Sequence, residues 1–196
     1  MIYVVKYSGK FGFIKPWTAV RDGETFSQQF LTPSIIEGIE KKLFPELLEF
    51  NGCIKKIIRH RLKYDSMDSQ QEQTQTHGWE YFPGKRLYVR GKLDKGKITR
   101  SILIRNVMIN PVLYLAFKEK VDAEKASKEH ICLCRNEDVM LPDENVITLS
   151  EQEFDALNGF ELRFGESENS FLVGYNRFDN ATPMYGWLEY NGNSVL

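Results

Sequence analysis

Residues 30–44, FLTPSIIEGIEKKLF, constrain the fold most because they predict one substantial helix in a chain otherwise patterned for strands. An apolar stripe at helical spacing predicts that this helix, over 33–44, buries one face, formed by Ile35, Ile36, Ile39 and Leu43. Thr32 stands at the N-cap, Pro33 occupies the first helical position and Ser34 follows it. We therefore assign Pro33 and Ser34 a structural role in starting the helix.

Gly38 lies in the interior of this predicted helix, where glycine costs about 1 kcal/mol relative to alanine. Such a cost suggests that another element or a ligand comes close to the helix backbone. We expect close packing against a sheet, which makes Gly38 a structural glycine.

Strand patterns and turn signals fill most of the remaining sequence. The first predicted elements are a strand at 2–7, a basic strand at 52–64 and a polar mobile loop at 65–78. Residues 85–121 follow as a basic hairpin with its turn near 94–96 and two further strands separated by a break at Asn110-Pro111. The last elements are a short helix entering a strand at 122–135, a short helix at 150–158 with a capping box of Ser150 and Glu153, a hairpin at 160–178 and a strand at 185–192. This order predicts an α+β fold with an antiparallel sheet and one main helix, best fitted by a ferredoxin-like (RRM-like) core. We place that core at residues 1–121 and a smaller, acidic, β-rich subdomain at residues 122–196.

The composition, 42% hydrophobic and 27% charged, is that of a globular protein without a membrane span. The chain has three cysteines, an odd number without a CxxC pair: Cys53, Cys132 and Cys134. This pattern argues against a disulfide framework and a zinc site, and it favours a cytoplasmic location. The sequence has no phosphate-binding or dinucleotide-binding glycine motif. We therefore expect no metal and no small-molecule cofactor.

Positive charge is concentrated in the first part of the chain. Residues 1–118 hold 20 Lys and Arg against 11 Asp and Glu, whereas residues 119–196 hold 6 against 16. The candidate RNA-binding cations are Lys55, Lys56, Arg59, Arg61, Lys63, Lys85, Arg86, Arg90, Lys95, Lys97 and Arg100. Aromatic residues lie among them, a combination that suits single-stranded RNA because cations hold phosphates and rings stack on bases. The alternative is that the basic and acidic parts neutralise each other across an interface.

Four stretches together resemble the CRISPR-associated Cas five family, part of the RAMP superfamily, and loosely its type I-C subgroup. They are the opening strand with its Gly and aromatic residues (7–16), the helix start TPSIIEGI (32–39), the strand pair RSILIRNVMINPVLYLAF (100–117), and GYNRF with YGWLEYNG (174–178 and 185–192). The resemblance implies an RRM-like core and a subunit of an RNA-guided antiviral complex that grips the 5′ handle of the CRISPR RNA. Its implied partners are that RNA and the other effector subunits.

The type I-C relatives also cut the CRISPR repeat, with a Tyr at the end of this helix and a later Lys-His pair. In this sequence the Tyr position falls on Phe44, and the pair falls near His130 with Lys128. Phe44 cannot move a proton, so His130 and Lys128 are the candidate catalytic residues of a metal-independent endoribonuclease. Three functions therefore remain open: a handle-binding subunit, a repeat-processing nuclease, and a single-stranded RNA-binding protein outside CRISPR systems.

Overall fold

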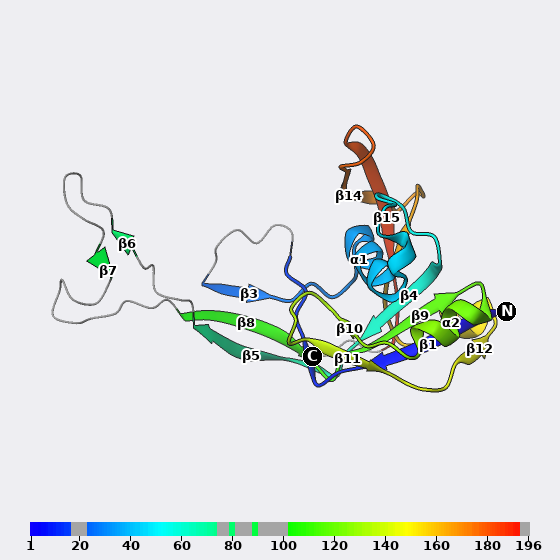
Figure 1. Cartoon of the computed structure of the whole chain (residues 1–196), viewed down its shortest axis with the longest axis horizontal. Coiled ribbons are helices and arrows are strands. Elements are labelled where there is room, and N and C mark those ends of the chain that lie inside the picture. Colours follow the sequence, from blue (N-terminus) through cyan, green and yellow to red (C-terminus); the bar gives the residue numbers. More distant parts are fainter. Residues whose placement is uncertain (17–22, 74–78, 81–87, 90–101, 193–196) are drawn as a thin grey trace.

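A computed structural model describes residues 1–16, 23–73, 79–80, 88–89 and 102–192 of the chain. Among them, nine strands form the largest sheet (Figure 1). Its spatial order is β10 (Ile131–Cys132), β11 (Val139–Pro142), β1 (Ile2–Ser8), β9 (Val112–Phe117), β4 (Ile57–Lys63), β13 (Gly159–Phe164), β15 (Thr182–Asn191) and β14 (Phe171–Asn176), with β12 (Ile147–Leu149) also paired to β1. All these pairings are antiparallel.

Helices α1 (Pro33–Leu43) and α2 (Lys120–Ala126) cover one face of this sheet. Apolar side chains alternate along the central strands, as a half-buried strand requires, and those facing the helices form the main core. That core joins Val5 and Tyr7 of β1 to Leu113, Leu115 and Phe117 of β9 and to the inner residues of both helices. The Tyr7 hydroxyl donates to the Ala126 carbonyl at 2.7 Å, which ties α2 to the sheet.

The short helix α3 (Glu151–Asp155) packs on the opposite face. The predicted capping box is confirmed, because the Ser150 hydroxyl accepts from the Glu153 N–H and the Glu153 carboxylate accepts from the Ser150 N–H. Phe154, fully buried, packs on Ile2 and Val4 of β1. Helix α3 thus covers part of the face that α1 and α2 leave open.

A second sheet extends from the first as a ribbon (Figure 1). Its strands are β2 (Phe11–Gly12), β8 (Ile102–Ile109), β3 (Glu24–Phe26) and β5 (Ser66–Gln73), and β3 pairs with β8 in parallel. The prediction of a mobile loop at 65–78 is wrong for residues 66–73, because every residue of β5 finds a register partner on β8. The predicted break at Asn110-Pro111 is confirmed as the turn between β8 and β9, where Asn110 has φ of 50°.

The remaining elements are short. A 3-10 turn (Pro45–Leu47) follows α1, and β6 (Trp79–Glu80) pairs with β7 (Tyr88–Val89). The predicted turn at 94–96 and the cations Lys85, Arg86, Arg90, Lys95, Lys97 and Arg100 lie outside the described residues. No helix in the described part is long and apolar enough to cross a membrane.

The C-terminal strands differ from the prediction in their pairing. The predicted hairpin at 160–178 is wrong, because β15 inserts between β13 and β14 and pairs with both. The sequence of residues 160–178 indicates two strands, but it does not indicate that a later strand will lie between them. Strands from both sides of residue 121 join in one sheet, and the division into residues 1–121 and 122–196 stays a prediction.

Helix α1 begins at Pro33 as predicted, although the Thr32 side chain does not cap it and instead hydrogen-bonds to the Ser34 hydroxyl at 3.1 Å. The prediction of close packing at Gly38 is wrong, since a Cβ placed there would meet no atom of the neighbouring elements within 4 Å. The buried acid of this helix, Glu40, holds the next segment by accepting from the N–H groups of Lys55, Lys56 and Ile57.

The molecule is therefore mixed α+β, dominated by open, mainly antiparallel sheets with few helices among its described residues. The general α+β class was predicted from the strand patterns and the single strong helix. The principal helix, the opening strand and the last strand all lie where the sequence placed them.

Candidate functional site

Arg59 and Arg61 are predicted to contact RNA, and in the structure both side chains are buried. They are 8% and 2% exposed and point from β4 to the face covered by α3. Glu161 of β13 pairs with both arginines: its Oε2 atom lies 2.6 Å from Arg59 Nη2 and 3.3 Å from Arg61 Nη2. Asp155 of α3 adds a 2.7 Å ion pair to Arg59.

Backbone carbonyls complete this buried ionic cluster. Arg61 Nη1 donates to the carbonyls of Asp155 and Leu157, each at 2.7 Å, and the Arg59 guanidinium lies 4.8 Å from the Phe154 ring centroid. Although burial alone would raise the pKa of Glu161, its hydrogen bond to Arg59 and the positive charges around it hold that pKa below its usual range. The two arginines therefore fix α3 and β13 to β4. For these two residues the structure matches the alternative in which basic and acidic parts of the chain neutralise each other.

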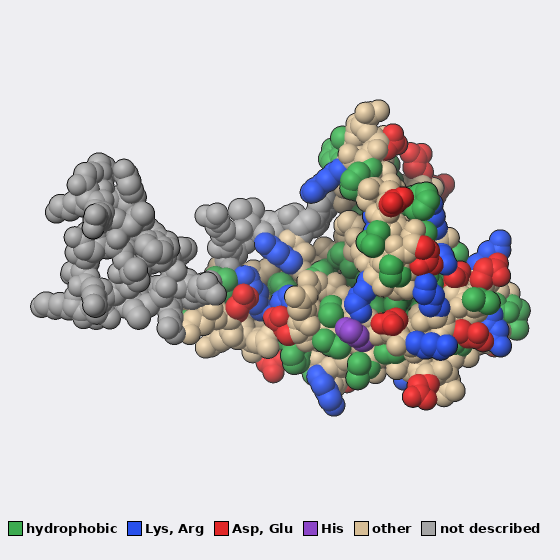
Figure 2. All heavy atoms as spheres, in the orientation of Figure 1, with side chains coloured by type: hydrophobic (Ala, Val, Ile, Leu, Met, Phe, Trp, Pro, Cys, Tyr) green, Lys and Arg blue, Asp and Glu red, His purple; other side chains and the backbone are tan. Residues whose placement is uncertain are grey.

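The predicted lysines of the 55–63 segment have different environments. Lys56 Nζ lies 2.6 Å from Asp122 and 3.3 Å from Glu46, so its charge is used within the protein. Lys55 is exposed, with Nζ 3.1 Å from the Phe50 ring centroid. Lys63 is half-buried and has no ion pair within the described residues. Figure 2 shows basic and acidic side chains interleaved over the described part of the visible face.

Lys63 belongs to a small group of side chains on the sheet face opposite α1 and α2, next to the part that α3 covers. In the register, Tyr114 of β9 lies directly between Lys6 of β1 and Arg61 of β4, and Lys63 is two residues further along β4. Such neighbours have Cβ atoms roughly 5 to 8 Å apart. We call Lys6, Tyr114 and Lys63 the open-face triad: two cations without an ion pair in the described part, flanking a half-buried ring. Sequence reasoning missed Lys6 and Tyr114 because only pairing places them beside Lys63.

The candidate catalytic residues His130 and Lys128 are both exposed. Helix α2 ends at Ala126 and β10 begins at Ile131, so the two residues lie in the connection and not on one strand. The two side chains therefore do not share a strand face. The His130 carbonyl accepts from Lys42 Nζ, which leaves the imidazole outside that interaction.

Phe44, at the position where the resembling nucleases carry Tyr, is fully buried. Its ring meets Phe117 edge-on with centroids 6.0 Å apart, and Lys56 Nζ lies 4.2 Å from its centroid. Phe44 is therefore part of the core at the end of α1.

His60 is a buried, structural histidine of β4. Its ring is 3% exposed and stacks on Phe164 with centroids 5.7 Å apart. Nε2 has no hydrogen-bond partner in the described part. Burial, which penalises the charged imidazolium, lowers the pKa of His60 to about 4.

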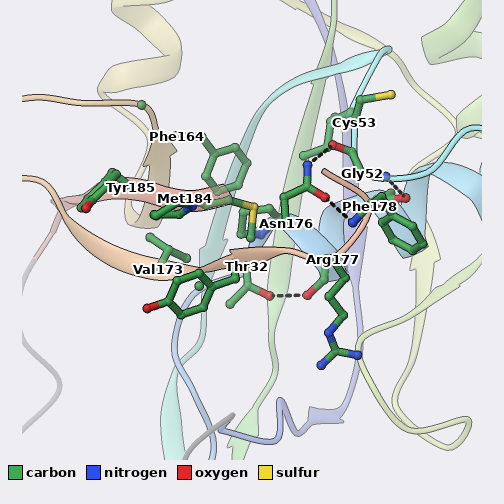
Figure 3. Close-up of a pocket in the computed structure, with 18 of the residues that line it drawn as sticks. Thr32, Gly52, Cys53, Phe164, Val173, Asn176, Arg177, Phe178, Met184 and Tyr185 are labelled. Atoms are coloured by element: carbon green, nitrogen blue, oxygen red, sulfur yellow. Dashed lines mark hydrogen bonds between the residues drawn. The ribbon is translucent and has the colours of Figure 1, made fainter. Parts of the chain in front are cut away.

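A groove of about 950 Å³ lies between the start of α1 and the β14–β15 pair (Figure 3). Its lining is mostly apolar and includes Phe164, Val173, Tyr175, Phe178, Met184 and Tyr185. Polar residues at its rim are engaged within the protein: Asn176 donates to the Gly52 carbonyl and accepts from the Phe178 N–H. We call this the α1–β15 groove. The sequence did not single it out, because the face of β14 and β15 could not be assigned before their pairing was known.

No group of His, Cys, Asp and Glu side chains in the described part could hold a metal ion. The three cysteines are free thiols.

Comparison with known proteins gives a structural neighbour but no sequence relative. No family model matches the chain, and no curated protein sequence matches it. Among solved structures, one chain titled "CRISPR RNA-guided surveillance complex" superposes with a TM-score of 0.53 at 10% sequence identity. The match covers 97% of this chain and 90% of that one, so the two share a fold over nearly their whole length.

Proposed function

We propose that this chain is an RNA-binding subunit of a CRISPR RNA-guided surveillance complex and that it grips the 5′ handle of the guide RNA. The observation that carries the proposal is the fold shared with a chain of such a complex over 97% of this sequence. Because the identity is only 10%, the likeness itself concerns the fold, and the function rests on that fold together with the surface described above.

We further infer a ferredoxin-like core of the RRM type. Strand β1 is followed by α1 and β4, and β9 is followed by α2 and β11, which supports a βαββαβ order. The spatial order β11, β1, β9, β4 places the first and third of these strands at the centre, with both helices on one face. The part of the opposite face that α3 does not cover is then open to a partner.

The RNA surface that we propose combines the open-face triad with Lys55 and the cations of residues 85–100. Lys6 and Lys63 would hold phosphates, and the Tyr114 ring between them would stack on an unpaired base. Arg59, Arg61 and Lys56 are left out because their charges are used within the protein. The role of Lys85, Arg86, Arg90, Lys95, Lys97 and Arg100 rests on the sequence alone.

The proposal predicts a salt-dependent interaction with handle RNA that weakens when the open-face lysines are neutralised. In filter binding with labelled repeat RNA, Lys6→Gln with Lys63→Gln should lower the slope of log affinity against log salt by about 0.7 for each phosphate that the variant no longer holds. The matched control is Lys118→Gln with Lys120→Gln, two exposed lysines outside the triad, which should leave the slope unchanged.

An RNA carrying a scrambled handle separates this function from general RNA binding. Preference for the native handle supports the CRISPR proposal, and equal affinity for both RNAs favours a single-stranded RNA-binding protein outside CRISPR systems. If the slope of log affinity against log salt were equal for the wild type and the Lys6/Lys63 double variant, the open-face triad would not be part of the RNA surface.

A further inference from the structure

The α1–β15 groove lies where the sheet extends past its helical layer. Strands β13, β15 and β14 continue the sheet beyond β4, whereas α1 packs on the core formed by β1, β9 and β4. The groove runs beside the start of α1, along the face of β14 and β15 (Figure 3). An apolar sheet face is normally covered by a second layer, and here the described chain supplies no helix for it.

The side chains at this groove are unusually apolar for a surface. Tyr175, Phe178 and Tyr185 are 55%, 64% and 39% exposed, and Phe164 is 39% exposed. Strand β14 has the sequence FLVGYN and carries no charge. Exposed apolar side chains that gather in one groove indicate an interaction site, whereas single exposed apolar residues are normal on a protein surface.

The polar groups of the groove are mostly occupied by the protein itself. The Glu37 carboxylate accepts from Lys41 Nζ at 2.7 Å and from the Gly52 N–H at 3.0 Å. The Thr32 and Ser34 hydroxyls bond each other. Of the charged lining residues, Arg177 and Glu166 have no ion pair within the described part. An occupant must therefore be bound mainly through its apolar surface.

We propose that the α1–β15 groove docks an amphipathic helix of a partner protein, with the apolar face of that helix against β14 and β15 and with lysines or arginines flanking this face. A helix laid beside α1 continues the helical layer over the outer strands. The groove volume equals about two turns of a helix with its side chains, enough to seat the buried half of a longer one.

Charge favours a basic helix over RNA. Exposed acids lie in the segments that border the groove: Glu166 and Glu168 between β13 and β14, and Asp179 between β14 and β15. Among the described residues that line the groove, the one cation is Arg177. Phosphates need several cations, whereas the lysines and arginines beside an apolar helical stripe complement these carboxylates. The docking site lies on the helix-covered side of the sheet and does not depend on the proposed RNA function.

The test uses the full chain as bait for a displayed library of helical peptides about 16 residues long, a length of about four turns. We expect the enriched peptides to share apolar residues at i, i+3, i+4 and i+7 with flanking lysines or arginines. A synthetic peptide of this consensus should lose at least about tenfold in affinity on Tyr185→Asp or on the more exposed Phe178→Asp. Tyr190→Asp, on the same strand but outside the groove, is the matched control and should bind normally.

Cys53 supplies a footprint of the same site, because its exposed thiol belongs to a lining residue. Bound peptide should slow the alkylation of Cys53, measured by mass spectrometry, and leave that of Cys134 unchanged. An enriched consensus without helical spacing, or binding unaffected by both groove variants, would overturn the proposal. So would repeat RNA that protects Cys53 and loses affinity on Tyr185→Asp, because the groove would then belong to RNA.

Discussion

Strand β4 presents three cations to one face of the sheet, and their environments differ completely. Arg59 and Arg61 lie under α3 and are closed off by Glu161, whereas Lys63, two residues beyond Arg61, has no ion pair in the described part. The charges are alike in the sequence, and what differs is the element that covers them. A run of basic residues on a strand therefore predicts an RNA surface only where nothing else in the chain packs on that face.

The covered end is the more sensitive to substitution, because Glu161 is the buried carboxylate that the two buried arginines share. Glu161→Gln should lower the free energy of unfolding by about 3 to 5 kcal/mol, since both guanidinium groups would remain buried without a carboxylate between them. Urea denaturation followed by circular dichroism measures the loss. Lys63→Met, on the same strand and face, is the matched control and should change stability by no more than about 0.5 kcal/mol.

A triple variant sharpens this contrast. Replacing Arg59, Arg61 and Glu161 together by Met, Leu and Met removes the three buried charges of this cluster at once and should cost much less than Glu161→Gln alone. If the single and triple variants were equally destabilised, shape and packing would outweigh charge in the cluster.

His60, between the two arginines in sequence, should give the fold a dependence on pH. Its folded pKa of about 4 lies below its ordinary value of 6.5, so the folded state binds fewer protons than the unfolded state between these values. The stabilisation is complete above pH 6.5, falls as the pH drops toward 4, and amounts to about 3 kcal/mol in all.

The variant His60→Leu isolates this contribution. It cannot ionise, so its free energy of unfolding should fall less steeply than that of the wild type between pH 6.5 and pH 4. Parallel curves for the two proteins across this interval would mean that folding does not lower the pKa of His60.

Local patterns made the main helix, the opening strand and the capping box predictable, because each depends on neighbours within a few residues. Pairing over long distances was not predictable in this way. The pairing of β15 with β13 joins residues 22 to 32 positions apart. The burial of Arg61 against Glu161 joins residues 100 positions apart. The open-face triad needed the same information, since Lys6, Lys63 and Tyr114 meet only through β9.

The smallest expected effect concerns Gly38, where the residue type alone led to a wrong prediction of its surroundings. Glycine in a helix suggested a crowded backbone, but a Cβ at Gly38 would enter open space above a hollow of about 250 Å³ bordered by Lys42 and Asn136. Gly38→Ala should therefore raise the free energy of unfolding by up to about 1 kcal/mol, because alanine restricts the unfolded chain and favours the helix. The measurement is urea denaturation of the isolated protein, with Ser34→Ala at the start of the same helix as a comparison. A loss of stability would mean that the site is crowded after all, and a gain in stability joined to weaker handle binding would mean that a partner uses the hollow.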